Sequence, residues 1–151
     1  MSVWGTGQKT ATESSVAETA ITVKTLWREK MLTFTIPLKP VTKKNSGQII
    51  TNKATGKPML IPSKQYRQYE KDAGVYVKGK GLKINEPVTV RCLYYMPTRR
   101  KVDLVNLLEA THDLLVKYEV LADDNCGIIY SVDGSRVFYD KEHPRTEVEI
   151  R

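Results

Sequence analysis

Residues 103–118 read DLVNLLEATHDLLVKY and carry the strongest helical pattern in the chain. At about 100° per residue, its mostly apolar side chains fall within one arc of roughly 120° that should face a core. These side chains are Leu104, Leu107, Leu108, Thr111, Leu114 and Leu115. The opposite arc is polar and includes Asn106, Glu109, His112 and Asp113. Asp103 stands where an acceptor for the first free backbone amides is expected, so the segment predicts a capped amphipathic helix.

Two strand patterns and a second helix precede this segment. LTFTIPL at 32–38 alternates between apolar and polar residues. VTVRCLYYM at 88–96 lies between two prolines and is rich in β-branched and aromatic residues, which favours a strand. Between these strands, Ser63 is a suitable N-cap for a helix that should end near Gly79 and Gly81.

Shorter strands are predicted in the rest of the chain. QIIT and PMLI favour a hairpin inside a basic loop ahead of Ser63. After the long helix, a strand in GIIYSVDG and the segment SRVFYD are expected to pair as a hairpin through Asp133 and Gly134, and RTEVEI at 145–150 closes the chain. The main elements follow the order β-α-β-α-β-β. This order predicts an α/β (α+β) fold with a small mixed sheet and two main helices.

Length and composition favour one domain. The chain has 151 residues, of which 40% are hydrophobic, enough for a single core. Residues 1–30 are rich in Thr, Ser, Ala and Gly and then show a short helical pattern. We interpret them as an N-terminal extension, poorly ordered or a short helix, ahead of a domain at 31–151. The alternative is a docking helix for a protein partner.

Cysteine content and hydropathy exclude several classes of protein. Cys92 and Cys126 are the only cysteines, and no C-x-x-C pair accompanies them. A disulfide framework or a zinc site is therefore not expected, and both thiols should behave as small buried hydrophobes. No apolar run approaches the roughly 18 residues of a membrane span, and the N-terminus lacks an apolar leader. We therefore expect a cytoplasmic protein without membrane contact.

The charge of the chain is unevenly distributed. Its net charge is +7, yet the segment 39–101 holds 15 Lys and Arg against Glu70, Asp72 and Glu86. The segment 102–151 reverses this balance, with 11 acidic against 5 basic residues. A basic stretch followed by an acidic one suits a protein that grips nucleic acid phosphates and also carries a divalent metal. The alternative is two solvated faces of opposite sign.

Acidic residues recur at both ends of the 103–118 helix. Asp103 lies at its start, and Asp123 and Asp124 lie in the turn that follows it. A helix of this length advances by some 22 Å, so these acids converge only if the turn lies on a returning segment. Hard cations such as Mg²⁺ prefer carboxylate oxygens, and two or three acids suffice beside a phosphate. The structural alternative is a helix cap and a turn, where Asp is common.

The chain resembles the RusA-type Holliday junction resolvases, small endonucleases encoded by phages or prophages. The resemblance spans about residues 31–150 and rests on TIPLKPVTKKN, on SKQYRQYEKDA and above all on RRKVDLVNLLEATHDLLVKYEVLADDN. Its sharpest element is Arg-Arg-x-x-Asp-Leu-x-Asn-Leu, followed by Asp ten residues, and Asp-Asp twenty residues, beyond the first Asp. The resemblance implies a RusA-like fold and a homodimer in a bacterial host. It also implies magnesium-dependent paired nicks in four-way DNA junctions.

Several residues match the family's pattern. Asp103 matches its first metal-binding aspartate, and Asp124 matches the later one, preceded by Asp123. Asn106 matches the asparagine of the family's Asp-Leu-Asp-Asn motif. The ion expected from the resemblance is Mg²⁺, for which Mn²⁺ is a common substitute.

Two positions depart from that pattern. Val105 replaces a second aspartate, and Glu109 replaces a catalytic lysine. Positions 105 and 109 are neighbours on one helix face. We therefore hypothesise that Glu109 supplies the missing carboxylate beside Asp103 and Asp123 or Asp124, with Asp113 as an extra ligand. The same departures motivate an alternative, a junction-binding protein with impaired catalysis, and residues 1–30 motivate another, a phage regulatory module that binds a protein.

Basic residues on both sides of the second helix are candidates for DNA contacts. Arg99 and Arg100 immediately precede the acidic helix and are the best candidates for positioning a phosphate. The complete predicted DNA-binding set is Lys43, Lys44, Asn45, Arg99, Arg100, Lys101 and Asn106. Because each neutralised phosphate releases counterions, binding should weaken steeply with salt.

Overall fold

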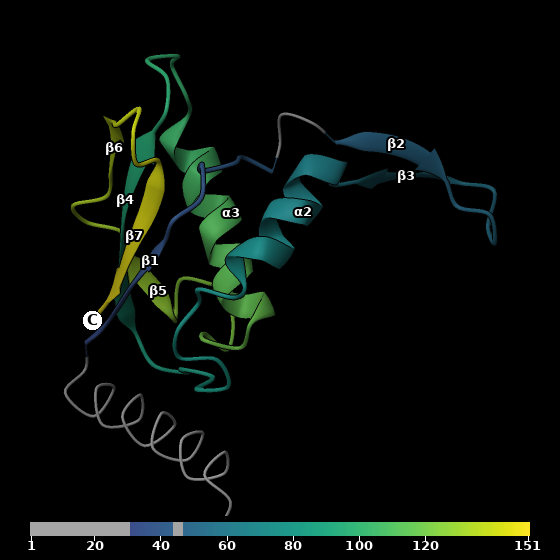
Figure 1. The fold of residues 1–151 in the computed structure, drawn as a ribbon. Coiled ribbons are helices and arrows are strands. Elements are labelled where there is room, and N and C mark those ends of the chain that lie inside the picture. The colour runs from purple at the N-terminus through teal and green to yellow at the C-terminus, as the bar shows by residue number, and fades with distance from the viewer. Residues whose placement is uncertain (1–30, 44–46) are drawn as a thin grey trace, which may run out of the picture.

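The computed structural model describes residues 31–43 and 47–151. Within them, two helices lie on the same side of a mixed β-sheet (Figure 1). This arrangement confirms the predicted α+β class with a small mixed sheet. The interpretation of residues 1–30 and the DNA contacts assigned to Lys44 and Asn45 lie outside the described residues.

The sheet is built around its longest strand. This strand, β4 (Val88–Met96), pairs antiparallel with β7 (Arg145–Ile150), which in turn pairs antiparallel with β1 (Leu32–Ile36). The other edge of β4 pairs in parallel with both β5 (Ile129–Ser131) and β6 (Arg136–Tyr139). The alternation of β1 and the two prolines that bound β4 therefore predicted real strands, and the last strand of the chain lies inside the sheet.

The predicted hairpin through Asp133 and Gly134 is wrong. The strands β5 and β6 lie one after the other along β4 and do not pair with each other. The turn between them shifts the chain along the edge of β4, and in the gap Ser135 Oγ accepts a hydrogen bond from the Cys92 amide at 3.0 Å. A local Asp-Gly signal predicts a turn, whereas the strand that each arm joins depends on the free edge of β4.

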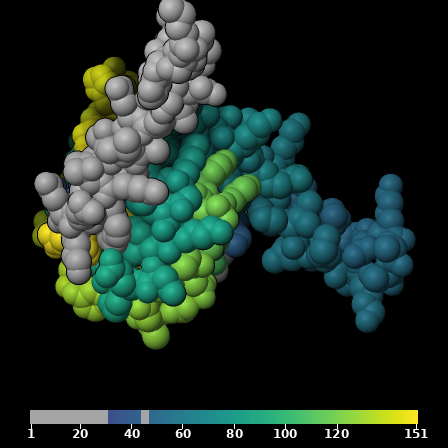
Figure 2. Space-filling view, turned by 90° about the horizontal axis from the view of Figure 1, so that it is seen from below, coloured from purple at the N-terminus to yellow at the C-terminus, as the bar shows by residue number. Residues whose placement is uncertain are grey.

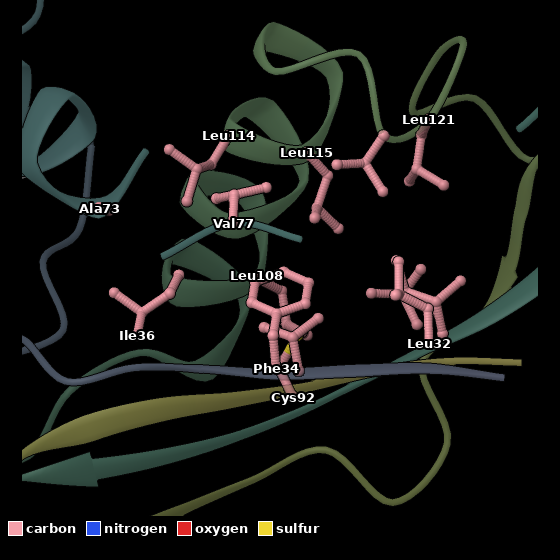
Figure 3. Packing of buried hydrophobic residues seen from close by; sticks show 14 of the residues in the cluster. Leu32, Phe34, Ile36, Ala73, Val77, Cys92, Leu108, Leu114, Leu115 and Leu121 are labelled. Atoms are coloured by element: carbon pink, nitrogen blue, oxygen red, sulfur yellow. The ribbon is translucent and has the colours of Figure 1, made fainter. Parts of the chain in front are cut away.

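The long helix α3 (Leu104–Lys117) forms as predicted. Asp103 Oδ1 accepts a hydrogen bond from the Val105 amide at 2.9 Å and caps the helix. The apolar arc packs on the sheet, where Leu108 and Leu115 lie above Phe34 and Leu32 of β1 (Figure 3). This packing buries one face of α3 and leaves its polar arc available on the other.

The helix α2 (Lys64–Ala73) begins as predicted but ends earlier. Ser63 Oγ accepts a hydrogen bond from the Tyr66 amide at 3.0 Å and caps the first turn. The helix ends at Gly74, well before the glycines expected to end it. A side chain at Gly74 would place its Cβ 2.1 Å from the Tyr118 ring, and the Tyr118 hydroxyl donates to the Glu70 carbonyl at 3.0 Å. The close approach of α3 therefore accounts for glycine at this position.

The predicted hairpin in the basic loop is confirmed. Its strands β2 (Gln48–Thr51) and β3 (Pro58–Ile61) pair antiparallel and extend away from the rest of the molecule (Figures 1 and 2). Ile49 and Leu60 face each other across the two strands and are 76% and 71% exposed. A two-stranded ribbon of this kind gains little stability by itself, since it packs on no core.

The two cysteines have different environments, although both were expected to be buried. Cys92 is fully buried in β4, as predicted, whereas Cys126 is exposed in the turn before β5. Both are free thiols. Within 31–43 and 47–151, none of the helices combines the length and apolar character that a bilayer crossing requires.

The packing of α3 on the sheet is testable by one truncation. Leu114 is 1% exposed, so Leu114→Ala should lower the free energy of unfolding by about 2–5 kcal/mol through lost burial and an unfilled cavity. Val105→Ala is the matched control, because Val105 lies on the same helix and is 65% exposed. Thermal or denaturant unfolding of both variants measures the difference. Equal unfolding midpoints would contradict this packing.

Candidate functional site

Two of the predicted acids converge beside the middle of α3. Asp113 lies in the third turn of α3, and Asp124 lies in the turn that follows the helix. Both line one hollow of about 370 Å³, together with Lys43 from the segment after β1 and Glu70 from α2. The chain therefore returns along α3 after the helix, as the sequence required for these acids to meet.

Lys43 is held inside this acidic surface. Its Nζ donates to Asp113 Oδ2 at 2.5 Å, and the two side chains are 38% and 26% exposed. The hydrogen bond to Asp113 raises the pKa of Lys43, and the charges of Asp113, Glu109 and Glu70 act in the same direction. Burial opposes this rise only in part. The ammonium is thus fully charged at neutral pH and lies in the field of several carboxylates.

A second ion pair fixes α2 against α3 at the border of the hollow. Lys117 Nζ donates to Glu70 Oε2, and both residues line the hollow. The Tyr118 hydroxyl binds the Glu70 backbone, and the Tyr66 hydroxyl donates to the Ala110 carbonyl at 3.4 Å. These contacts set the spacing of the two helices and hence the width of the hollow.

Asp123 serves its own turn. Its Oδ1 accepts a hydrogen bond from the Asp124 amide at 2.8 Å, and its Oδ2 accepts one from the Asn125 side chain at 2.7 Å. The hydrogen bond from Asn125 is the largest cause that lowers the pKa of Asp123, followed by the bond from the backbone of Asp124. Both carboxylate oxygens therefore orient the loop that presents Asp124.

Asp103 lies away from the hollow. It caps α3, and ten residues of helix separate it from Asp113, a rise of about 15 Å. Glu109 lies one helical turn before Asp113 and contributes to the field at Lys43. The structure thus brings together Asp113, Asp124 and the surroundings of Glu109, and it does not place Asp103 beside them.

His112 faces the same acids from the buried side. Burial is the main cause that lowers its pKa, and the charges of Asp124 and Asp113 oppose this shift. Its Nε2 is buried and has no hydrogen-bond partner within the part of the chain that the structure describes. The sequence placed His112 on the exposed polar arc of α3, so its burial beneath the turn of Asp124 was missed.

The donor chemistry of the hollow fits a hard divalent cation. Asp113 and Asp124 offer carboxylate oxygens, and Mg²⁺ is commonly held by one or two carboxylates while waters and substrate phosphates complete its octahedron. The volume of about 370 Å³ accommodates several waters at about 30 Å³ each. No three Asp, Glu, His or Cys side chains of residues 31–43 and 47–151 form a closed ligand set. The residues therefore fit an open site that a substrate completes.

The predicted DNA-binding residues flank the start of α3. Arg99 stacks over the Tyr139 ring at 4.3 Å from its centroid, and Arg100 and Lys101 are exposed in the same connection between β4 and α3. Asn106 is half-buried in the first turn of α3. Basic groups and acidic groups thus follow one another along one helix. Tyr139, which orients Arg99, carried no signal in the sequence.

Some residues of the hollow were not predicted from the sequence. Glu70 and Lys117 are absent from the predicted site, because each looks like an ordinary polar helix residue and their pairing joins positions far apart in the chain. Asp113 had a weak signal, since it lies four residues after Glu109 on one helix face. That spacing alone gives no reason to prefer Asp113 to Asp103.

The cap at Asp103 gives a prediction that separates stability from chemistry. Asp103→Ala should lower the free energy of unfolding by about 1 kcal/mol, whereas Asp103→Asn should leave it nearly unchanged, because asparagine caps helices as well as aspartate does. Denaturant unfolding measures both variants. Equal losses for Ala and Asn would show that the carboxylate charge, and not the hydrogen bond, stabilises the helix end.

Comparison with known proteins identifies the family of the chain. A family model described as Endodeoxyribonuclease RusA matches residues 37–151, which include all the strands after β1, both helices and the acidic hollow. A search of the curated proteins finds no match. The match covers well over half of the sequence and agrees with the resemblance seen in the arginine and aspartate pattern. The chain belongs to the RusA endodeoxyribonuclease family.

Proposed function

We propose that this chain resolves Holliday junctions and related branched DNA by paired, magnesium-dependent nicks. Family membership supports cleavage of DNA, and the hollow between α2, α3 and the loop of Asp124 supports the position of the site. The observation that carries the proposal is that Asp113 and Asp124, from separate segments, line one hollow beside Lys43.

The residues of the hollow suggest a division of labour. Asp113 and Asp124 would hold Mg²⁺ or Mn²⁺, and Glu109 would add its charge one turn away. When bound, the ion supplies Lewis acidity to the reacting phosphate. Asp123 orients the loop of Asp124. Asp103 matches the family's first metal-binding aspartate, and its part in catalysis can be tested with Asp103→Asn without loss of the helix cap.

The DNA would follow the basic side of the molecule. Arg99, Arg100 and Lys101 lie before α3, and Lys43 lies at its middle, so phosphates on either side of the acids meet positive charge. Lys44, Asn45 and Asn106 are proposed as further contacts. The projecting hairpin adds Lys53 and Lys57 near its tip. A junction is larger than one such surface, which favours contacts from more than one chain.

We further propose that the active form is a homodimer. A four-way junction has two symmetric strands to be cut, and two copies related by a twofold axis would present one site to each. Paired nicks then follow from symmetry. A phage or prophage origin and action in a bacterial host agree with this role.

Incubation with a labelled synthetic four-way junction tests the proposal. With Mg²⁺ we expect two symmetric nicks near the crossover, and with EDTA we expect binding without nicks. A linear duplex of the same sequence is the control, and its cleavage at the same rate would contradict selectivity for junctions. Absence of metal-dependent cleavage on either substrate would reject the nuclease assignment.

A second function is supported by one departure in the site. Val105 replaces an expected aspartate and is 65% exposed on the helix face that leads to Glu109 and Asp113. A chain with too few ligands would bind junctions without cutting them. Retained junction affinity with no cleavage in Mg²⁺ or Mn²⁺ would favour this second candidate.

A further inference from the structure

The loop after β1 delivers a positive charge to the centre of the acidic hollow. Lys43 lies seventy positions before its partner Asp113, so only the tertiary fold joins them. Its ammonium hydrogen-bonds to the same carboxylate that, together with Asp124, lines the hollow. A protonated amine and a divalent cation both seek carboxylate oxygens, and both cannot occupy Asp113 Oδ2 at once.

The pairing also has a natural alternative. Lys43 is 38% exposed and is carried on a connecting segment, so its side chain is not locked in a core. An ammonium is a strong partner for a phosphate oxygen, and a DNA strand passing the hollow would bring such oxygens within its reach. Glu70, by contrast, is already paired with Lys117, so Asp113 is the carboxylate that Lys43 would release.

We propose that Lys43 acts as an exchangeable counterion. It occupies Asp113 until a DNA phosphate draws it away, and Asp113 then becomes available to the metal. This inference rests on the proposed function, and it makes Lys43 a catalytic residue that contacts the substrate phosphate and couples its arrival to metal binding. By linkage, DNA and metal then strengthen each other's binding.

The exchange has a physical advantage. Four acids, Glu70, Glu109, Asp113 and Asp124, lie on or near one small surface, and they repel one another and the approaching DNA. Lys43 offsets part of this charge while no cation is bound. After the exchange, the same ammonium neutralises the phosphate, where negative charge develops during cleavage.

Metal titration of the protein without DNA tests the exchange. The probe is Mn²⁺, followed by the electron paramagnetic resonance signal of the free ion. We expect Lys43→Gln to bind Mn²⁺ about 10-fold more tightly than the unmodified protein, because the competing charge next to Asp113 is gone. Lys39→Gln is the matched control, since Lys39 is exposed and lies four residues earlier, and it should change the affinity less than twofold.

A double substitution shows whether Asp113 is the shared group. In an Asp113→Asn background, Lys43→Gln should give no gain in Mn²⁺ affinity, since the competition has lost its object. Unchanged or weaker Mn²⁺ binding by Lys43→Gln would overturn the proposal, as would an equal gain in Lys39→Gln or a gain that persists without Asp113. Junction cleavage by the unmodified protein is measured separately, so failure of the exchange is distinguished from failure of the nuclease function.

Discussion

Asp124→Asn is expected to lower the rate of magnesium-dependent nicking of a four-way junction by about 10³-fold or more. Asn keeps the size of the side chain and removes the charge that would hold the ion. Asp124 lines the hollow beside Asp113, and the adjacent Asp123 is hydrogen-bonded within the turn, so no neighbouring carboxylate is placed to substitute for it. Single-turnover cleavage measures the loss.

The control for this substitution is Asp133→Asn. Asp133 is an exposed acid in the turn between β5 and β6, and its amide donates to Ser131 Oγ at 3.2 Å. Cleavage by this variant should stay within about twofold of the unmodified rate, because one distant exposed charge is screened. Junction affinity of Asp124→Asn, measured by gel shift in EDTA, should be retained. Nicking at the original rate by Asp124→Asn would remove the acidic hollow as the active site.

Glu109→Gln is expected to reduce cleavage as severely as Asp124→Asn. The charge of Glu109 acts on Lys43, so the carboxylate lies within the field of the hollow. Where the family commonly carries lysine, this chain therefore adds negative charge, which serves a cation better than a phosphate. Cleavage of the labelled junction at saturating and limiting Mg²⁺ separates loss of metal affinity from loss of turnover.

Glu119→Gln is the matched control for Glu109. Glu119 pairs with Lys83 at 3.1 Å on an exposed surface after α3, so the loss of its charge should leave cleavage almost unchanged. Full activity of Glu109→Gln would end the hypothesis that this residue replaces the missing aspartate. Val105 would then mark a site that works with fewer carboxylates.

Local signals in the sequence were sufficient for the individual elements. The cap at Asp103 and the apolar arc of α3 predicted its start and its buried face, and the prolines around β4 predicted its ends. These features depend on hydrogen bonds and contacts between residues close in the chain, which sequence patterns report directly. The arginine and aspartate pattern around α3 also indicated the family before any coordinates were considered.

Pairing between distant segments needed the tertiary structure. The sequence suggested a hairpin between β5 and β6, but both strands join β4, because its free edge offers more hydrogen bonds than a local turn can. Likewise α2 ends at Gly74, where the Tyr118 ring leaves no room for a side chain. Neither outcome can be read from a local pattern, since the partner lies far away in the chain.

By itself, the sequence determined the helix, its cap, the mixed sheet and the presence of acids and bases in one family pattern. Only the tertiary structure decided which of those charges meet: Asp113 with Lys43 and Asp124, and Glu70 with Lys117, while Asp103 stays at the helix end. The reason is that helix periodicity fixes the direction of a side chain from its own backbone. The identity of the charge opposite depends on how separate segments close around a common core.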